Sequence, residues 1–285
     1  MGWAPKPDPM GSTDIATGVA ADPFATSIRR HVIEQSMRAK VGHIGSALSI
    51  ADIIAALYDR VMDIESPEAA DRDRLVLSKG HAVLAVYAAL HLKGWMSAEQ
   101  LNTFCGDRSS LGVHPEHQLR GIDFSSGSLG QGMSVGAGAA LAARLQKSAR
   151  RVFVVLSDAE CDEGSVWEAM AFAAHHRLSN LVAILDLNGQ QAFGFTKDVI
   201  AMENMAERWT AFGWHAVEID GHDPAAMAAA IADHRTSGIA KPLGLIARTV
   251  FGCGVDYMEN TIKWHYSPMD ESQFASAMAQ IGGAR

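Results

Sequence analysis

Residues 151–194 read RVFVVLSDAECDEGSVWEAMAFAAHHRLSNLVAILDLNGQQAFG, and they predict the architecture of the whole chain. An apolar run at 152–156 predicts a buried strand, the segment from about residue 165 predicts a helix, and a second apolar run at 181–185 predicts another strand. Two parallel strands joined by a helix bring both strand C-termini to one edge of the sheet. Open α/β folds bind their ligands at that edge.

Polar residues follow both predicted strands at this edge. Asp158 comes soon after the first strand, and Asn188 follows the second, thirty positions later. A carboxylate and an amide carbonyl that face each other suit a hard divalent cation such as Mg²⁺ or Ca²⁺. The helix after Glu160 would direct its N-terminus at an anion held by that cation. The stretch therefore predicts a metal-bound diphosphate, although Asp and Asn also favour turns after strands without any ligand.

The rest of the chain continues the alternation of helices and strands. Helices are expected from residue 23 and at 47–62, 82–92, 199–212, 224–235 and 270–281, and strands at 75–77, 214–219 and 243–250. Ser46 is expected to cap the second helix. This alternation predicts one doubly wound α/β domain over residues 22–285, with a mainly parallel sheet and helices on both faces. Residues 1–21, rich in Pro, Gly, Ser, Thr and Asp, predict a flexible tail.

A glycine-rich segment, GSLGQG at 127–132, precedes another predicted helix. That helix contains Gly132, Gly136 and Gly138. Each glycine costs a helix roughly 1 kcal/mol relative to alanine. We therefore expect another backbone or a ligand to approach this helix closely.

Composition narrows the function classes. The net charge of −8, with no Lys/Arg cluster, argues against a nucleic-acid partner. The three cysteines are widely spaced and predict neither a disulfide framework nor a zinc site, which favours a reducing compartment. The longest apolar run, at 82–90, is too short to span a membrane, and the N-terminus lacks a signal-peptide pattern. A cytoplasmic protein is expected.

Six motifs occur in a fixed order along the chain. They are Gly42-His43, Ser78-Lys79-Gly80-His81-Ala82, His114-Pro115-Glu116, Gly127-Ser128-Leu129-Gly130-Gln131-Gly132, the pair Asp158 and Asn188, and Met258-Glu259-Asn260 with Trp264-His265. Together they resemble the N-terminal domain of transketolase and cover nearly the whole chain beyond the tail. The likeness is greatest to the separate N-terminal subunit of two-component transketolases, in which one enzyme is encoded as two chains.

This resemblance implies that the chain binds thiamine diphosphate through a divalent metal, Mg²⁺ or Ca²⁺. Asp158 and Asn188 would supply side-chain oxygens to the metal, and Gln190 its backbone carbonyl. The backbone N–H of Ala159 would meet the diphosphate. The cofactor contacts implied by the resemblance are those of His81, Gly127, Leu129, Asp158, Ala159, Glu160, Asn188 and His265.

The same resemblance assigns catalytic roles to His43, His81, His114 and His265. They would line the channel to the thiazolium, bind substrate hydroxyls and move protons, which neutral imidazoles near pH 7 can do. For a single histidine, a surface or core position is the alternative. The spacing of His114 and His117 resembles that of a metal-binding pair, but Pro115 breaks the helix that would align them. Glu163 and Glu168 match acidic residues at the family's subunit interface.

The implied reaction is the transfer of a two-carbon ketol unit from a ketose donor to an aldehyde acceptor. The family's pyrimidine-binding and C-terminal domains, with the glutamate that activates the cofactor, have no counterpart in this sequence. We therefore expect the isolated chain to be inactive. A partner subunit carrying those domains would complete an α2β2 heterotetramer, without nucleic acid or membrane as a partner.

Five residues depart from the family pattern and keep two alternatives open. Ser157, Ala159, Ile44, Ser128 and Tyr266 stand where the family usually has glycine or proline. Ala159 would be strained if its turn required a positive φ. One alternative is a related carboligase of a specialised pathway that acts on an unusual sugar or an oxo-acid. The other is a degenerate subunit that serves only as a scaffold.

Overall fold

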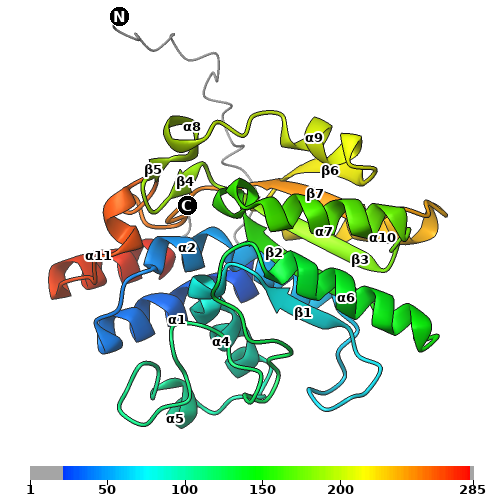
Figure 1. Cartoon of the computed structure of the whole chain (residues 1–285). Coiled ribbons are helices and arrows are strands. Elements are labelled where there is room, and N and C mark those ends of the chain that lie inside the picture. Colours follow the sequence, from blue (N-terminus) through cyan, green and yellow to red (C-terminus); the bar gives the residue numbers. More distant parts are fainter. Residues whose placement is uncertain (1–21, 283–285) are drawn as a thin grey trace, which may run out of the picture.

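The computed structural model describes residues 22–282. The tail predicted at 1–21 lies outside the described residues, as do residues 283–285. Figure 1 shows a central sheet with helices packed around it.

The central sheet has five strands, all parallel, in the order β1-β2-β3-β7-β6. Their bounds are β1 (Arg74–Leu77), β2 (Val152–Ser157), β3 (Leu181–Leu187), β6 (His215–Asp220) and β7 (Leu243–Arg248). A separate antiparallel pair consists of β4 (Gln190–Gln191) and β5 (Gly194–Phe195). The predicted parallel sheet is therefore confirmed (Figure 1).

The helices complete two layers around the sheet. Their bounds are α1 (Pro23–Ala39), α2 (Ile44–Ser49), α3 (Ala51–Ala55), α4 (Val83–Leu92), α5 (Ala98–Leu101), α6 (Gly132–Leu145), α7 (Gly164–His175), α8 (Thr196–Val199), α9 (Met205–Ala211), α10 (Pro224–Thr236) and α11 (Glu271–Gly282). No helix among residues 22–282 combines the length and apolar character needed to cross a bilayer.

Alternate residues of the central strands enter two separate hydrophobic cores. In β2, Phe153 and Val155 pack with α1, α3, α4, α10 and α11, whereas Val154 and Leu156 pack with α6, α7 and α9. Successive side chains of a strand point to opposite faces, so a strand covered on both sides is apolar throughout. This explains why the runs at 152–156 and 181–185 predict buried strands without an alternating pattern.

Local sequence also sets several helix ends. Asp22 accepts the backbone N–H groups of Phe24 and Ala25 at 2.9 and 3.0 Å, and Pro23 occupies the first turn of α1. Asp223 and Pro224 begin α10 in the same way. A carboxylate acceptor followed by proline satisfies and pre-forms a first helical turn.

Two predicted helices differ from the structure. The helix expected at 47–62 is divided into α2, α3 and a π-helix (Ala56–Val61), and α2 begins at Ile44 because His43 adopts a left-handed conformation with φ of 60°. The capping role predicted for Ser46 is therefore wrong, since Ser46 lies inside α2. The helix expected at 199–212 is interrupted between α8 and α9, where Asn204 is also left-handed.

Close contacts explain two of the three glycines in α6. A Cβ on Gly132 would lie 2.3 Å from the Oγ of Ser78, and one on Gly136 would lie 2.2 Å from Cγ2 of Val154. The expected approach of a backbone is confirmed at Gly132, where the Cα of Ser78 would lie 2.7 Å from the Cβ, whereas at Gly136 the close group is a side chain. Nothing lies within 4 Å of a Cβ on Gly138, which is exposed.

These two environments predict opposite effects of the same substitution. Gly136→Ala should destabilise the chain by about 1–3 kcal/mol, because the methyl group overlaps Val154 in a packed core. Gly138→Ala should stabilise it by up to about 1 kcal/mol through helix propensity alone. Urea unfolding of the two variants measures both effects. A G136A chain as stable as the wild type would contradict the close packing of α6 on β2.

Candidate functional site

The predicted metal-binding residues lie at the carboxyl ends of β2 and β3. Asp158 Oδ1 accepts the N–H of Ala159 at 2.9 Å, and its Oδ2 accepts the N–H of Gly189 at 2.8 Å. Asn188 is the neighbour of Gly189, so one carboxylate joins the loops that follow the two strands. The side chains of Asp158 and Asn188 are both buried. The structure thus brings together the two residues that the sequence places thirty positions apart.

Asn188 and Gln190 form the second half of this edge. Asn188 Oδ1 accepts the N–H of Gln190 at 2.9 Å, while its Nδ2 donates to Asp186 Oδ2 at 2.9 Å. The side-chain amide of Gln190 is buried, and neither its oxygen nor its nitrogen has a hydrogen-bond partner within the described residues. A buried amide without a partner is costly unless a ligand completes its bonds.

A buried ion pair beneath these loops has no role in the sequence-based prediction. Lys79 Nζ pairs with Asp186 Oδ2, and the two side chains are only 1% and 0% exposed. Asp186 Oδ1 also accepts the hydroxyl of Ser49 at 2.6 Å and the hydroxyl of Thr249. Asp186 ends an apolar strand run. A carboxylate at the end of an apolar run indicates a buried charge, and a buried charge requires a partner. The sequence therefore contained a signal for this ion pair.

Asp158, by contrast, has no ion-pair partner among residues 22–282. Burial and the nearby charge of Asp186 raise the pKa of Asp158 to about 7. A divalent cation would supply the missing positive charge and prefers the carboxylate, amide and carbonyl oxygens present here. The orphaned amide of Gln190 lies in the same loop. These observations fit a hard metal ion at this edge.

Glu160 holds the glycine-rich segment in place. Its Oε1 accepts the hydroxyl of Ser78 at 2.5 Å and the N–H of Gly130 at 3.0 Å, and its Oε2 accepts the N–H of Ser157 at 3.0 Å. Ser157 in turn accepts the N–H of Glu160, which completes a capping box at the start of the 3₁₀ helix Asp158–Asp162. The cofactor contact assigned to Glu160 stays a prediction, and the structure adds this bracing role.

The backbone at Ala159 is unstrained. Ala159 lies in the 3₁₀ helix and is not among the residues with positive φ. Alanine therefore replaces the usual glycine without conformational cost. Its N–H donates to Asp158 in this structure, so its contact with a diphosphate stays a prediction.

Three of the four predicted catalytic histidines form a compact cluster. The ring centroids of His43, His81 and His265 are 5.3 to 5.5 Å apart. The N–H of His43 donates to the carbonyl of His265 at 3.2 Å, and Nε2 of His81 bonds the hydroxyl of Ser46 at 2.9 Å. Nδ1 of His43 and Nδ1 of His265 are buried without partners within the described residues.

The environment keeps these rings neutral at pH 7. Burial lowers the pKa of His43, and it lowers the pKa of His81 much further, with Lys79 adding to that effect. Burial, followed by His43, lowers the pKa of His265 to about 4. A neutral ring has one N–H donor and one lone pair. Each of the two buried, unpartnered nitrogens therefore has a donor or acceptor position that no described residue fills.

His114 lies beside the cluster and contacts the glycine-rich segment. Its charge would depress the pKa of His43, and its ring would lie 2.9 Å from a Cβ on Gly127. Gly127 has a φ of 149°, which side chains rarely adopt. Gly127 thus allows the close approach of His114. The neighbouring side chain of Leu129 is 40% exposed, and the cofactor contacts of both residues stay predictions.

Helix α2 connects the oxygen-lined edge to the histidine cluster. His43 precedes its first residue, Ser46 contacts His81, and Ser49 accepts a hydrogen bond from Nδ2 of Asn188 at 3.3 Å. Its six residues of α-helix extend about 9 Å. The two halves of the site are therefore held at a separation set by one short helix.

Glu163 and Glu168 lie on the surface at the start of α7. Both are exposed. Leu129, Val135 and Phe172, on or beside the neighbouring helices, are 37 to 41% exposed and add apolar area to this region. The interface role of the two glutamates stays a prediction.

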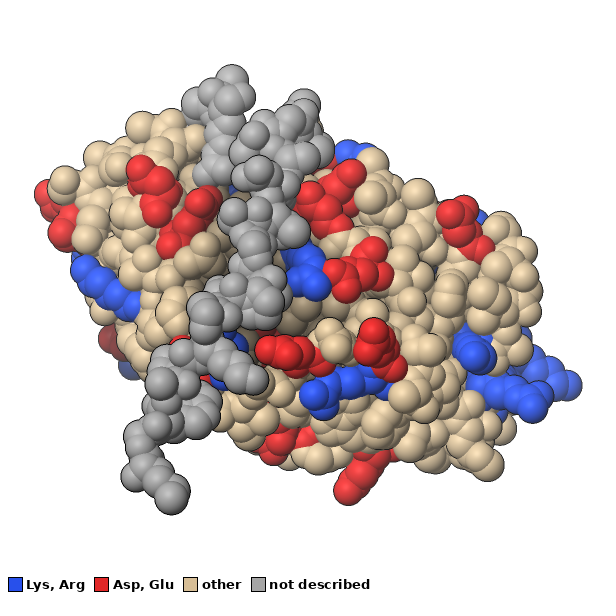
Figure 2. All heavy atoms as spheres, turned by 90° about the horizontal axis from the view of Figure 1, so that it is seen from above, with Lys and Arg blue, Asp and Glu red and all other residues tan. Residues whose placement is uncertain are grey.

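The charges seen on one face give no support to a polyanionic partner. Among the residues drawn in colour in Figure 2, acidic and basic side chains are interspersed over most of the face, and basic ones gather only in a small group at its lower right edge. Nucleic-acid binders usually present a continuous basic patch to the phosphate backbone.

A known protein family matches nearly the whole chain. Residues 21–284 match the family described as transketolase, thiamine diphosphate binding domain. The chain is 39% identical over 257 residues to an apulose-4-phosphate transketolase subunit of Phocaeicola vulgatus, with 89% of this chain and 90% of that protein aligned. It is 37% identical over 260 residues to the 6-deoxy-6-sulfo-D-fructose transketolase subunit SqwG of a Clostridium species, with 90% and 94% aligned.

Solved transketolases share the fold over most of this chain. The transketolase of Campylobacter jejuni superposes with a TM-score of 0.84 at 30% identity, covering 92% of this chain and 42% of that one. The transketolase of Leishmania mexicana gives a TM-score of 0.84 at 29% identity, covering 92% and 41%. The chain therefore spans about two-fifths of the length of these solved transketolases.

The buried charge of Asp158 predicts a pH-dependent effect of Asp158→Asn. Because the pKa of Asp158 is raised to about 7 in the folded chain, the folded chain keeps a proton that the unfolded chain releases near pH 4. The associated stability is lost as pH rises from about 4 to about 7. The D158N chain has no such proton, so its Tm relative to the wild type should increase by several degrees over this range and then level off.

Thermal unfolding of both metal-free chains between pH 5 and 8 measures this difference, and the histidine titrations cancel in the comparison. Asp107→Asn, at an exposed carboxylate, is the control and should give a difference that does not vary with pH. A flat difference for D158N would show that Asp158 carries no uncompensated charge.

Proposed function

The chain belongs to the transketolase family, and on that premise we propose that it is the diphosphate-binding subunit of a two-component transketolase. It transfers a two-carbon ketol unit from a ketose donor to an aldehyde acceptor. The observation that carries this proposal is the arrangement along α2, with an oxygen-lined edge at one end and neutral imidazoles at the other. The described residues, 22–282, then form a single domain on the diphosphate side of the cofactor.

Thiamine diphosphate is the cofactor of this site. When bound, it supplies carbanion stabilisation, and the protein supplies orientation and proton transfer. The side-chain oxygens of Asp158 and Asn188 and the backbone carbonyl of Gln190 would hold the divalent cation, Mg²⁺ or Ca²⁺, that accompanies the diphosphate. The raised pKa of Asp158 supports this assignment, because the carboxylate lacks an ion-pair partner within the described residues.

The histidines handle the substrate hydroxyl groups and their protons. His43 and His265 each keep an unbonded Nδ1, so each can accept a proton from a hydroxyl or donate one, depending on its tautomer. Ser46 fixes the orientation of His81 through Nε2. A ring with a depressed pKa returns its proton readily at pH 7, which suits the transfer steps of a ketol cleavage.

A second subunit completes the active site. The relatives in Phocaeicola vulgatus and Clostridium are named as subunits, and this chain aligns with at least 90% of each of them. The partner carries the pyrimidine-binding and C-terminal domains, and two copies of each chain form an α2β2 heterotetramer. Glu163 and Glu168 lie at the contact between subunits. The three free thiols are consistent with a cytoplasmic location.

Reconstitution tests the proposal directly. The purified chain with thiamine diphosphate and Mg²⁺ should show no ketol transfer, because the glutamate that activates the cofactor belongs to the partner. Adding the partner subunit should restore turnover, measured by release of the aldehyde product. Turnover by the isolated chain would contradict the two-subunit assignment. If calorimetry detects no cofactor binding with or without the partner, the scaffold alternative is favoured.

A specialised substrate is the second candidate function. Both aligned subunits carry the names of unusual sugars, apulose 4-phosphate and 6-deoxy-6-sulfo-D-fructose. Residues that depart from the family pattern lie beside the histidines here. Ile44 follows His43 and is buried, while Tyr266 follows His265 and its hydroxyl donates to the carbonyl of Ala192 at 2.6 Å. These side chains change the wall next to the proposed substrate channel.

Donor screening of the reconstituted pair separates the two candidates. If the altered wall selects an unusual sugar, kcat/KM for xylulose 5-phosphate should be at least about tenfold below that for the preferred donor, equivalent to about 1.4 kcal/mol. Tyr266→Gly should narrow this gap, and Tyr58→Phe, whose ring packs on Trp95 in the core, serves as the aromatic control. Efficient use of xylulose 5-phosphate by the wild type would contradict the specialised function and favour the ordinary transketolase reaction.

A further inference from the structure

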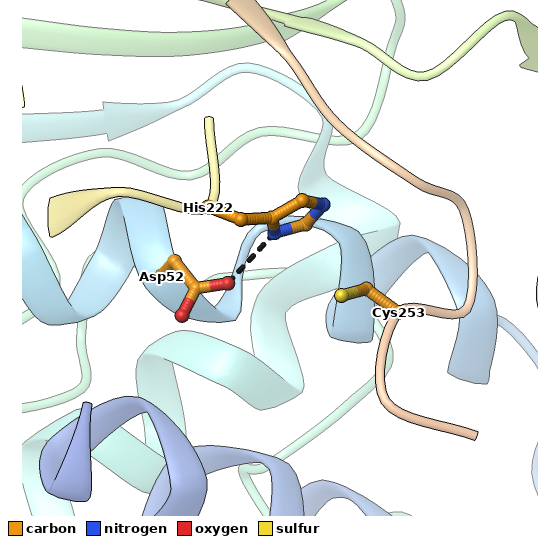
Figure 3. Close-up of side chains that lie close together, drawn as sticks. All are labelled: Asp52, His222 and Cys253. Atoms are coloured by element: carbon orange, nitrogen blue, oxygen red, sulfur yellow. Dashed lines mark hydrogen bonds and ion pairs between the residues drawn. The ribbon is translucent and has the colours of Figure 1, made fainter. Parts of the chain in front are cut away.

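A second group of reactive side chains lies outside the cofactor site. Asp52 from α3, His222 after β6 and Cys253 after β7 place one potential ligand atom each within 4.8 Å of the others (Figure 3). Arg29 from α1 joins them, donating to both carboxylate oxygens of Asp52 and to the carbonyl of Cys253 at 3.2 Å. The group therefore draws on four separate segments of the chain.

The hydrogen bonds in this group leave little room for a metal ion. Both oxygens of Asp52 accept bonds from Arg29, and Oδ2 also contacts Nδ1 of His222 at 2.7 Å. Nε2 of His222 accepts the N–H of Val250 at 2.8 Å, so this nitrogen has no lone pair for a cation. Arg29 already supplies the positive charge. An Asp–His–Cys set of this kind resembles a zinc site in composition only.

The sulfur of Cys253 is the member of the group with the fewest bonds. Its Sγ accepts one long contact, from Nη2 of Arg29 at 3.5 Å. The residue is half-buried, in contrast to the fully buried Cys161. Two glycines flank it, Gly252 with φ of 77° and Gly254 with φ of 101°. They turn the backbone so that its carbonyl and sulfur both face Arg29.

Electrostatics in the group favour the thiolate. Burial and the carboxylate of Asp52 raise the pKa of Cys253, whereas the Arg29 guanidinium, 3.5 Å from the sulfur, lowers it, and the net direction is downward. Thiolates are the reactive form of cysteine and occur next to cationic side chains in partly exposed positions. We propose that Cys253, held against Arg29, is a modification site that reacts with peroxides.

The chemistry balances with hydrogen peroxide as the oxidant. The thiolate sulfur attacks one peroxide oxygen, an S–O bond forms and the O–O bond breaks. Hydroxide leaves and takes up the proton released by the thiol, giving water. The sulfur is oxidised by two electrons to a sulfenic acid, and the peroxide is reduced. The site is separate from the histidine cluster, although Phe251, two residues before Cys253, stacks on His265 with ring centroids 5.9 Å apart.

The other two cysteines provide internal controls. Cys105 is exposed, but burial of its sulfur, only partly offset by Arg38, raises its pKa. Cys161 is fully buried, and burial with nearby carboxylates raises its pKa well above the usual value. Exposure alone ranks Cys105 as the most reactive. The proposal ranks Cys253 first.

The test uses the full reduced chain, dilute hydrogen peroxide and a 1,3-diketone probe that traps sulfenic acids, with peptide mass spectrometry for each cysteine. At pH 7 Cys253 should be labelled at least about fivefold faster than Cys105, because a lower thiol pKa increases the thiolate fraction. Cys161 should be the slowest. Equal or faster labelling of Cys105 would overturn the proposal, whichever variants fold.

Substitution of Arg29 tests whether its positive charge causes the reactivity of Cys253. Arg29→Gln should slow the labelling of Cys253 severalfold and leave Cys105 unchanged, since Arg29 contacts only the former sulfur. Arg30→Gln, on the exposed side of the same helix, is the matched control. An R29Q chain that folds and reacts at the wild-type rate would also contradict the proposed role of this group. If R29Q does not fold, the labelling rates of Cys253 and Cys105 in the wild-type chain still test the proposal.

Discussion

The ion pair between Lys79 and Asp186 is buried at the carboxyl edge of the sheet, next to the loop of Asn188. Lys79 follows β1, Asp186 lies near the end of β3, and Ser49 and Thr249 bring α2 and the segment after β7 to the same carboxylate. Removing one partner of such a buried pair typically costs about 3–5 kcal/mol, because the other charge is left uncompensated. The pair thus fixes where four segments meet, and the loops of Asp158 and Asn188 rest on that junction.

The two buried carboxylates at this junction are treated differently. Asp186 is neutralised by Lys79 and surrounded by hydroxyl donors, whereas Asp158 receives only backbone N–H groups and lies close to the charge of Asp186. One carboxylate is therefore neutralised by a lysine, and the other has no ion-pair partner within the described residues. The same division holds for the histidines, because His81 is tied to Ser46 while His43 and His265 keep unbonded nitrogens. The site thus contains two kinds of buried polar group, those whose bonds are completed within the chain and those that lack a partner among the described residues.

Sequence alone predicted the parts of this architecture that depend on local patterns. The apolar runs of β2 and β3, the helix between them and the polar residues at their ends follow from periodicity and strand direction. The start of α2 could not be predicted, because the left-handed conformation of His43 accompanies a bond to His265 far along the chain. The same holds for Arg29 and Cys253, which meet although 224 positions apart. Ala159 illustrates the opposite case, where the strain considered from the sequence is absent because the turn is an ordinary 3₁₀ helix.

Helix α2 limits how a site of this kind can diverge. Each residue of an α-helix turns the chain by about 100° and advances it by about 1.5 Å. Inserting or deleting one residue between Ser46 and Ser49 would rotate the contact with His81 away from the contact with Asn188. Exchanges of side chains, such as isoleucine at position 44, do not change the relative directions of these two contacts. New substrates can therefore be reached by substitution around a helix of fixed length, while changes in chain length are confined to the loops outside it.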